Sequence, residues 1–404
     1  MNSMIVQQAS TFLNAVVSQM TDQSGLAAIN NFSDVVSVAE VLLQTGRDPV
    51  LNAVSQVWRD TVFAVRDYDL PNSALRMTAS RYGNATRKLS PVAKMAEDDP
   101  SWAWPATYDA GQNPPLGNGQ SIDAWRISKS DVLQTNFYGS SVYHMPYTIF
   151  LEQFDVAFSS AEELVRFNQM NVTERLNDRK RFEEAKSMAL QVNFIAGLLD
   201  EANTDRVVHA LTEYNTLAGF GTPLTAQTVF QPGNFEGFIR WLYSRIKSIV
   251  GLMRHSSQKY QTVIGTKAIL RHTSPENVRV ALYRPFLEMI NSMVLSGLYH
   301  NDLMTLPTYE AVDFWQSIDS PQGINAKPVY TDTNGNQKIA SAAVTNSTVI
   351  GLIHDRDALG YAWLNPHTLV SPLNSAGQYY NEDYHARFAT LSDNTEKAVV
   401  ICLD

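Results

Sequence analysis

The 404-residue sequence lacks several features that mark secreted, membrane-spanning or disulfide-rich proteins. Its one cysteine, Cys402, excludes an intramolecular disulfide and any zinc site built on a Cys-x-x-Cys pair. No charged-then-apolar leader opens the chain, and no apolar run approaches the roughly 18–20 residues of a membrane helix. We therefore expect a protein without signal peptide or membrane span that folds in a reducing compartment such as the cytoplasm.

An excess of positive charge is also missing. Lys and Arg number 31 against 40 Asp and Glu, which gives a formal net charge of −9. A surface that binds DNA or RNA generally is normally basic. The charge balance therefore argues against such a surface, although it leaves room for a protein that merely encloses nucleic acid. Hydrophobic residues make up 44% of the chain, which is enough for a sizeable core.

Catalytic motifs are scarce: no P-loop, His-Glu-x-x-His or Gly-x-Ser-x-Gly pattern occurs. One cluster stands out, GLIHDRDALG at 351–360. A metal-dependent hydrolase could combine His354, Asp355 and Asp357 with the acidic and histidine residues of 380–385. However, neighbouring strand residues point to opposite faces, and Asp-x-Asp after an apolar strand is typical of a strand-end turn. We favour a structural corner between two strands and expect no catalytic residue, metal or cofactor.

The sequence predicts a mixture of helices and strands. A helix is expected from about 160 to 200, because Ser-x-x-Glu pairs suited to a capping box precede an apolar periodicity. Its second half carries an apolar stripe at Phe182, Ala185, Ala189, Val192, Ala196 and Leu199. A second amphipathic helix is expected at 234–253, and Asn334-Gly335 indicates a hairpin. Further helices are expected within 1–57, and strands at 61–68, 134–158, 262–283, 343–353 and 397–403.

The segment at about 71–131 has no sustained period, and prolines and glycines interrupt it throughout. It also contains Trp102, Trp104 and Trp125, which would be costly to leave in water. Long structureless loops are uncommon inside compact domains. We interpret the segment as an extended arm whose tryptophans dock on another subunit. The alternative is an ordered loop folded against its own domain.

The order of these elements resembles the major capsid proteins of tailed bacteriophages, which have the Hong Kong 97-type coat fold. The closing segment carries the most specific resemblance, with STVIGLIHDRDALGYAW followed by SPLNSAGQYYNEDYHARFATLSDNTEKAVVICLD. RHTSPENVRV, 271–280, is similar to another recurring segment of that family. The resemblance covers the whole chain by order of elements and about 60 residues by motif.

The resemblance implies an α+β fold divided into an arm and two domains. Residues 1–57 would form the N-terminal helical arm, and 220–340 the axial domain. Residues 58–219 and 341–404 would form the peripheral domain, which includes the extended loop 69–133 and the spine helix 160–202. Predicted inter-subunit contacts are Trp102, Trp104, Trp125, Asp355, Arg356 and Asp357.

The resemblance also implies a function and partners. The chain would be a non-enzymatic shell subunit that forms hexamers and pentamers of an icosahedral phage head, assembled in the host cytoplasm. Scaffolding and portal proteins, decoration proteins and double-stranded DNA packaged without sequence specificity would be its partners. An encapsulin-like nanocompartment shell is an alternative with the same fold, distinguished by an enzyme cargo. The metal-dependent hydrolase is an alternative of a different class.

Overall fold

The computed structural model describes ten stretches of the chain: 75–77, 86–92, 125, 132–137, 140–150, 161–201, 203–231, 233–265, 269–289 and 309–404. The predicted N-terminal arm 1–57 and the predicted strand 61–68 lie outside these residues. So do Trp102 and Trp104 and most of the predicted extended loop. None of the helices in the part described is long and apolar enough to cross a membrane.

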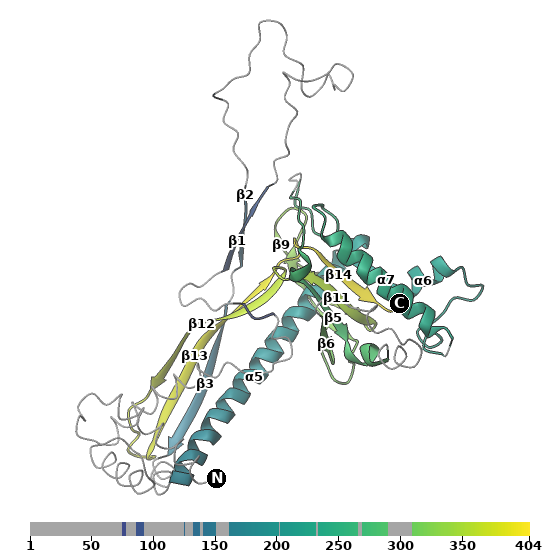
Figure 1. Cartoon of the computed structure of the whole chain (residues 1–404). Coiled ribbons are helices and arrows are strands. Elements are labelled where there is room, and N and C mark those ends of the chain that lie inside the picture. The colour runs from purple at the N-terminus through teal and green to yellow at the C-terminus, as the bar shows by residue number, and fades with distance from the viewer. Residues whose placement is uncertain are drawn as a thin grey trace.

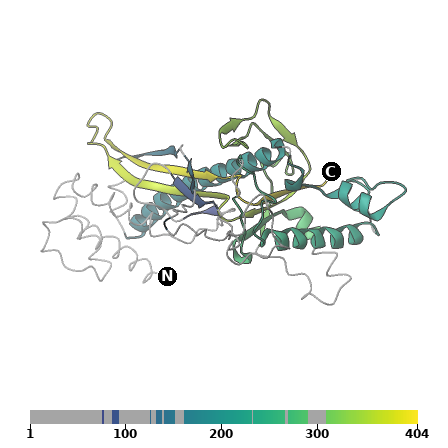
Figure 2. The same cartoon turned by 90° about the horizontal axis from the view of Figure 1, so that it is seen from above.

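The described chain forms two lobes (Figure 1). The long lobe pairs one helix with a three-stranded antiparallel sheet in the order β12-β13-β3. Its elements are α5 (Ala161–Asp200), β3 (Ser140–Phe150), β12 (Leu359–Val370) and β13 (Tyr379–Ser392). Figure 2 shows the helix and the sheet extending together away from the second lobe.

The round lobe is built on a five-stranded mixed sheet in the order β4-β14-β11-β5-β6. Its strands are β4 (Val207–His209), β5 (Val278–Tyr283), β6 (Tyr309–Val312), β11 (Val349–Asp355) and β14 (Ala398–Cys402). Its helices are α6 (Ala210–Ala218) and α7 (Phe235–Met253). α7 confirms the helix predicted at 234–253, whereas the strands predicted over 262–283 are confirmed only at β5.

Helix α5 matches the predicted long helix, and 40 residues correspond to roughly 60 Å. The predicted apolar stripe is partly wrong, because Ala185 and Ala189 are exposed. The helix instead buries Glu183, Ser187 and Leu190 on the side that faces the sheet. Val192 and Ala196 of the stripe are buried, and Phe182 and Leu199 pack against the same core. Apolar periodicity therefore finds part of the buried face and misses its polar members.

The sheet of the round lobe is covered on both faces. Ala398, Val400 and Cys402 of β14 belong to the core that includes the C-terminal half of α5. The intervening Val399 and Ile401 belong to the core formed with α7. Alternate strand residues point to opposite faces, so an uninterrupted apolar strand is what a sheet between two helical layers requires.

Strand β11 contains a bulge where it pairs with β14, between Val349 and Gly351. A Cβ atom at Gly351 would lie 3.0 Å from Cδ2 of Leu282 and 3.4 Å from the carbonyl oxygen of Ala281. Any larger residue would therefore crowd the neighbouring strand β5. The bulge and the close approach fix β11 in the centre of the sheet.

Residues 341–404 contribute strands to both lobes. β11 and β14 lie in the five-stranded sheet, whereas β12 and β13 lie in the long lobe. The chain consequently passes between the lobes twice, once after β11 and once between β13 and β14. The predicted domain boundaries stay a prediction, but the strands of this segment are divided between two sheets.

Shorter elements surround the point where the lobes meet. β8 (Val329–Thr331) pairs with β9 (Gln337–Ile339), which confirms the predicted Asn-Gly hairpin, and Gly335 has a φ of 82°. The side chain of Asn193 on α5 accepts from the N–H of Val329 and donates to its carbonyl oxygen. β7 (Ile324–Ala326) pairs with β10 (Val344–Asn346), and β1 (Thr86–Pro91) pairs with β2 (Val132–Phe137).

Candidate assembly site at the base of the arm

The antiparallel pair β1–β2 forms the base of the predicted extended loop. Its register runs from Thr86 opposite Phe137 to Pro91 opposite Val132, so residues 92–131 leave and return at one end of the pair. The two strands stand at the meeting point of the lobes (Figure 1). Within the loop the described residue is Trp125, which is 89% exposed.

Lys88 of β1 fastens the arm to the body. Its Nζ donates to Oδ2 of Asp393 at 2.9 Å, to a carboxylate oxygen of Glu396, and to the carbonyl oxygen of Asp357 at 3.2 Å. The side chains of Asp393 and Glu396 are only 1% and 8% exposed. A lysine from an arm is thus held by two buried carboxylates of the loop that joins β13 to β14.

Arg271 completes this cluster from the opposite side. Its guanidinium donates to the carboxylate of Glu396, to Oγ1 of Thr395 at 2.9 Å and to Oγ of Ser90 at 3.3 Å. Two cations therefore face two carboxylates, and both sides of the cluster touch β1. We define Lys88, Ser90, Arg271, Asp393, Thr395 and Glu396 as the arm junction.

Burial and charge act in opposite directions on the acids of the arm junction. Burial works to raise the pKa of Asp393, but Lys88, the hydrogen bond from Thr395 and the charge of Arg271 outweigh it, and the pKa is lowered. At Glu396 burial dominates over Lys88 and Arg271, and the pKa is raised. A buried group of this kind depends on all its partners, because removing one leaves an uncompensated charge.

A second layer of polar residues lies beneath the arm junction. The fully buried Arg206 donates to Oε2 of Glu201 at 2.7 Å and to the carbonyl oxygens of Asn394, Glu396 and Ala398. Burial lowers the pKa of Arg206 to about 10, so it stays charged at neutral pH. The guanidinium thereby orders the backbone that carries Asp393 and Glu396.

Lys397 ends the same loop and is buried as well. Its Nζ donates to the carbonyl oxygen of His255 at 2.7 Å and to Oγ of Ser257 at 3.0 Å. Burial lowers the pKa of Lys397 to about 8. The five residues 393–397 are all buried, although their sequence is typical of an exposed polar turn.

The corner at 354–357 lies beside the arm junction and has the predicted structural geometry. Oδ1 of Asp355 accepts the N–H of Asp357 at 2.8 Å, and Oδ2 accepts the hydroxyl of Thr273 at 2.5 Å. The N–H of Arg356 donates to the carbonyl oxygen of Asn277 at 2.8 Å. The corner thus ends β11, turns the chain into β12 and binds the 271–280 segment.

The three residues of the corner that were predicted as inter-subunit contacts differ in exposure. Asp355 is 6% exposed and both its carboxylate oxygens are bound within the chain. Arg356 and Asp357 are exposed. An inter-subunit contact at this corner therefore stays a prediction for Arg356 and Asp357, while Asp355 acts inside the subunit.

The structure does not bring the two halves of the hydrolase interpretation together. Burial lowers the pKa of His354 to about 4, and its Nδ1 lies 2.8 Å from the carbonyl oxygen of Asp355. Glu382 pairs with Val370, eleven residues along β12 from Leu359, which places it roughly 35 Å from the corner. Glu382 instead forms a bidentate ion pair with Arg175 of α5. Within the described residues, no group of three or more His, Cys, Asp or Glu side chains is arranged to hold a metal ion.

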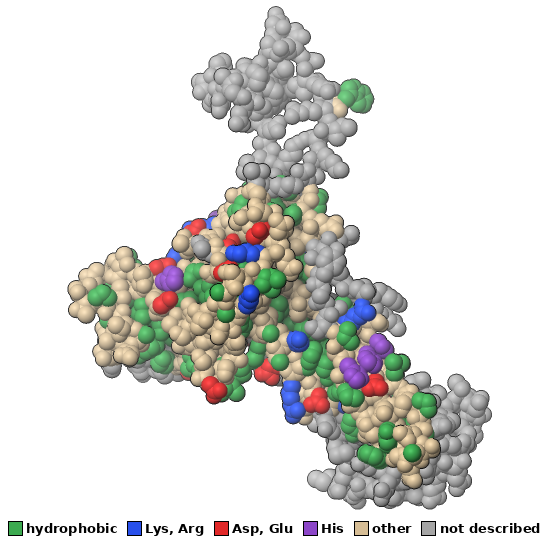
Figure 3. Space-filling view, turned by 180° about the vertical axis from the view of Figure 1, so that it is seen from behind, with side chains coloured by type: hydrophobic (Ala, Val, Ile, Leu, Met, Phe, Trp, Pro, Cys, Tyr) green, Lys and Arg blue, Asp and Glu red, His purple; other side chains and the backbone are tan. Residues whose placement is uncertain are grey.

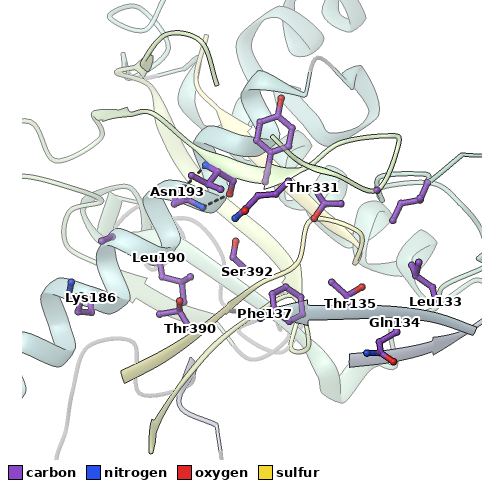
Figure 4. Close-up of a pocket in the computed structure, with 16 residues that line it drawn as sticks. Leu133, Gln134, Thr135, Phe137, Lys186, Leu190, Asn193, Thr331, Thr390 and Ser392 are labelled. Carbon is purple, nitrogen blue, oxygen red and sulfur yellow. Dashed lines mark hydrogen bonds between the residues drawn. The ribbon is translucent and has the colours of Figure 1, made fainter. Parts of the chain in front are cut away.

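A cavity of about 650 Å³ opens next to the arm junction. It lies between the arm strand β2, helix α5, the β8–β9 hairpin and the end of β13 (Figure 4). Thr135 and Phe137 line it from β2, and Lys186 and Leu190 from α5. The base of the arm is therefore packed at the arm junction and open on the side of the cavity.

Sequence reasoning found part of this site. It singled out the 271–280 and 354–357 segments, which the structure joins through Thr273 and Asp355. It singled out neither the loop 393–397 nor Lys88. The signal available was the density of charged and hydroxyl residues in DNTEK directly before an apolar strand.

Comparisons with known proteins test the fold. No protein-family model and no curated protein matches the chain. Similar solved structures include one titled "Structure of head fiber and inner core protein gp22 of native bacteriophage P68", with a TM-score of 0.52 and 7% identity over 84% of this chain and 86% of that one. Another is "Capsid structure of Staphylococcus phage Andhra", with a TM-score of 0.48 and 9% identity over the same shares.

The chain has an α+β fold similar to that of phage capsid structures. The α+β architecture predicted from the sequence is confirmed. Helix α5 covers most of the residues predicted for the spine helix, and β1 lies within the residues predicted for the extended loop. The assignment of these elements to capsid domains stays a prediction. At 7% identity the likeness concerns the fold alone.

Proposed function

We propose that the chain is a major capsid protein whose copies assemble into hexamers and pentamers of an icosahedral phage head. The observation that carries the proposal is the arm: the β1–β2 pair is fastened to the body by Lys88 and leads into a segment of about 40 residues, 92–131. Shell subunits gain stability from area shared between copies. A base that is fixed to the body would set the direction in which the arm extends toward a neighbouring subunit.

In the proposed shell, Trp102, Trp104 and Trp125 would contact a neighbouring subunit. Large aromatic side chains contribute much of the binding free energy at protein interfaces. Trp125 is 89% exposed on the single chain, which is compatible with burial in an assembly. Arg356 and Asp357, exposed at the corner, would add charged contacts at the edge of the interface.

The proposed location is the virion, after assembly in the host cytoplasm. Scaffolding and portal proteins and decoration proteins would be partners of the assembled shell, which would enclose double-stranded DNA without reading its sequence. The net charge of −9 is compatible with a wall that encloses DNA, since packaged DNA brings its own counterions.

Negative-stain microscopy and size-exclusion chromatography of the purified full chain test the proposal. Megadalton shells, rings or tubes are the expected result. A compact monomer at every concentration, or bound zinc accompanied by hydrolytic activity, would contradict it. Nuclease-protected DNA inside particles recovered from infected cells would distinguish a phage head from a nanocompartment with an enzyme cargo.

Lys88→Met sharpens the same experiment. Loss of the lysine leaves Asp393 and Glu396 short of a partner and frees the base of the arm, so we expect at least a tenfold loss of assembled particles with a folded subunit. Lys247→Met on α7 is the matched control, because that lysine is exposed. Equal assembly of both variants would show that the contacts of Lys88 in the arm junction are irrelevant to association.

A further inference from the structure

A row of three histidines crosses the outer face of the long lobe. His367 of β12 pairs with His385 of β13, which pairs with His144 of β3. The rings of His144 and His385 are stacked with centroids 4.7 Å apart and an interplanar angle of 14°. The rings of His385 and His367 are stacked at 5.4 Å and 21°. We call these three residues the histidine stack.

The histidine stack lies at the surface. Seen from behind, histidine side chains gather on the long lobe beside acidic and hydrophobic side chains (Figure 3). His144 and His367 are exposed and His385 is half-buried. All three side chains point away from α5, since their strand neighbours Tyr143 and Tyr384 are buried on the opposite face.

Few charged groups face the histidine stack. From β13, Asp383 lies 2.7 Å from Nε2 of His144, and Arg387 occupies the next outward position along the strand. The other outward residues of β3 and β12 near the stack are uncharged, among them Val142 and Leu369. On the α5 side, Glu382 is already paired with Arg175. Among the described residues, a fully protonated stack would therefore place three imidazolium charges beside the carboxylate of Asp383.

The three rings differ in their hydrogen-bond partners. Nδ1 of His367 lies 3.1 Å from the carbonyl oxygen of Asn365, and His144 contacts Asp383. Among the residues that the structure describes, His385 touches the two other rings and has no hydrogen-bond partner for its own ring. Protonation of the central ring would thus place a charge between the two other imidazole rings.

A bulge divides strand β12 into a proximal and a distal segment that can move separately. Its pairing with β13 shifts between Leu364 and His367, where Asn365 has a φ of 47° and Pro366 has no N–H to donate. The proximal segment, 359–364, is anchored by the buried Tyr361 and Trp363. The distal segment, 367–370, begins with a histidine of the stack and lies at the edge of the sheet.

We propose that the histidine stack is a pH-sensitive element that releases the distal segment of β12 on acidification. Imidazole is the side chain whose charge changes most readily on mild acidification. Once the rings carry protons, like charges about 5 Å apart repel each other, and the bulge lets the distal segment move without the core. The element concerns the folded subunit itself and does not depend on the proposed capsid function.

Hydrogen exchange of the full-length wild-type protein at pH 7.5 and 5.5 tests the proposal, after correction for the intrinsic pH dependence of exchange. Repulsion between charges at this spacing at a partly exposed site should accelerate exchange at 367–370 by about tenfold. Exchange at 359–364 should stay unchanged. Equal acceleration of both segments, or of neither, would overturn the proposal.

Two variants isolate the charge from the packing. His385→Gln removes the central ring, and His385→Phe keeps an aromatic ring that cannot be protonated. Both should reduce the acid-dependent acceleration at 367–370 to at most about twofold. His272→Gln, which removes an exposed histidine elsewhere, should behave as wild type. An acceleration that persists in both His385 variants would assign the effect to another group.

Discussion

The two lobes differ in how the faces of their sheets are covered. In the round lobe a five-stranded sheet has apolar cores on both faces, one with α5 and one with α7. In the long lobe α5 covers one face of the sheet, while the opposite face exposes 66% of Val142 and 57% of Leu369. The sheet of the round lobe is thus covered on both faces by the chain itself. The long lobe and the arm present the surfaces on which an assembly of copies would act.

The largest expected effect is a difference in the free energy of unfolding between substitutions in the two lobes. Leu352 in the centre of β11 is fully buried, so Leu352→Ala should lower the free energy of unfolding by about 2–5 kcal/mol. Val142→Ala on the outer face should change it by less than about 0.5 kcal/mol. Urea denaturation of the unassembled subunit measures both. Comparable losses would show that the outer face is part of a closed core.

A pH-dependent effect is expected at the loop that connects the lobes. The pKa of Lys397 is lowered to about 8 in the folded protein, against about 10.4 for an ordinary lysine. The unfolded chain therefore binds more protons between these values, and stability should rise on the order of 2 kcal/mol as the pH increases from 8 to 10.4. Lys397→Met should flatten this rise, as followed by urea denaturation at each pH. A rise of the same size in the variant would assign it elsewhere.

The smallest expected effect separates two neighbours in the corner. Asp355→Ala removes the acceptor of both Thr273 and the N–H of Asp357, so it should cost about 1–3 kcal/mol of stability. Asp357→Ala should leave the stability of the isolated subunit within about 0.5 kcal/mol and affect only assembly. Thermal unfolding and size-exclusion chromatography distinguish the two outcomes. The reverse order would mean that Asp357, not Asp355, ties the corner.

Several elements could be predicted because their signals are local. The capping residues and length of α5, the amphipathic α7 and the Asn-Gly turn of β8–β9 each lie within one segment of sequence. The arm junction could not be predicted, since Lys88 and Glu396 are 308 residues apart. Such a pair depends on how the lobes meet. The polar part of the buried face of α5 was missed for a related reason: the tertiary arrangement buries Glu183 and Ser187 despite their polarity.

The central claim of the proposed function is that the arm of one subunit binds to a neighbouring subunit. Because Pro91 lies opposite Val132, residues 92–131 can be replaced by a two-residue Asn-Gly turn that closes β1 and β2 into a hairpin. Negative-stain microscopy and light scattering of this variant beside the wild type give the most direct test. The account predicts a folded, monomeric variant with an unchanged melting temperature and no particles. Particles formed as efficiently as by the wild type would contradict it.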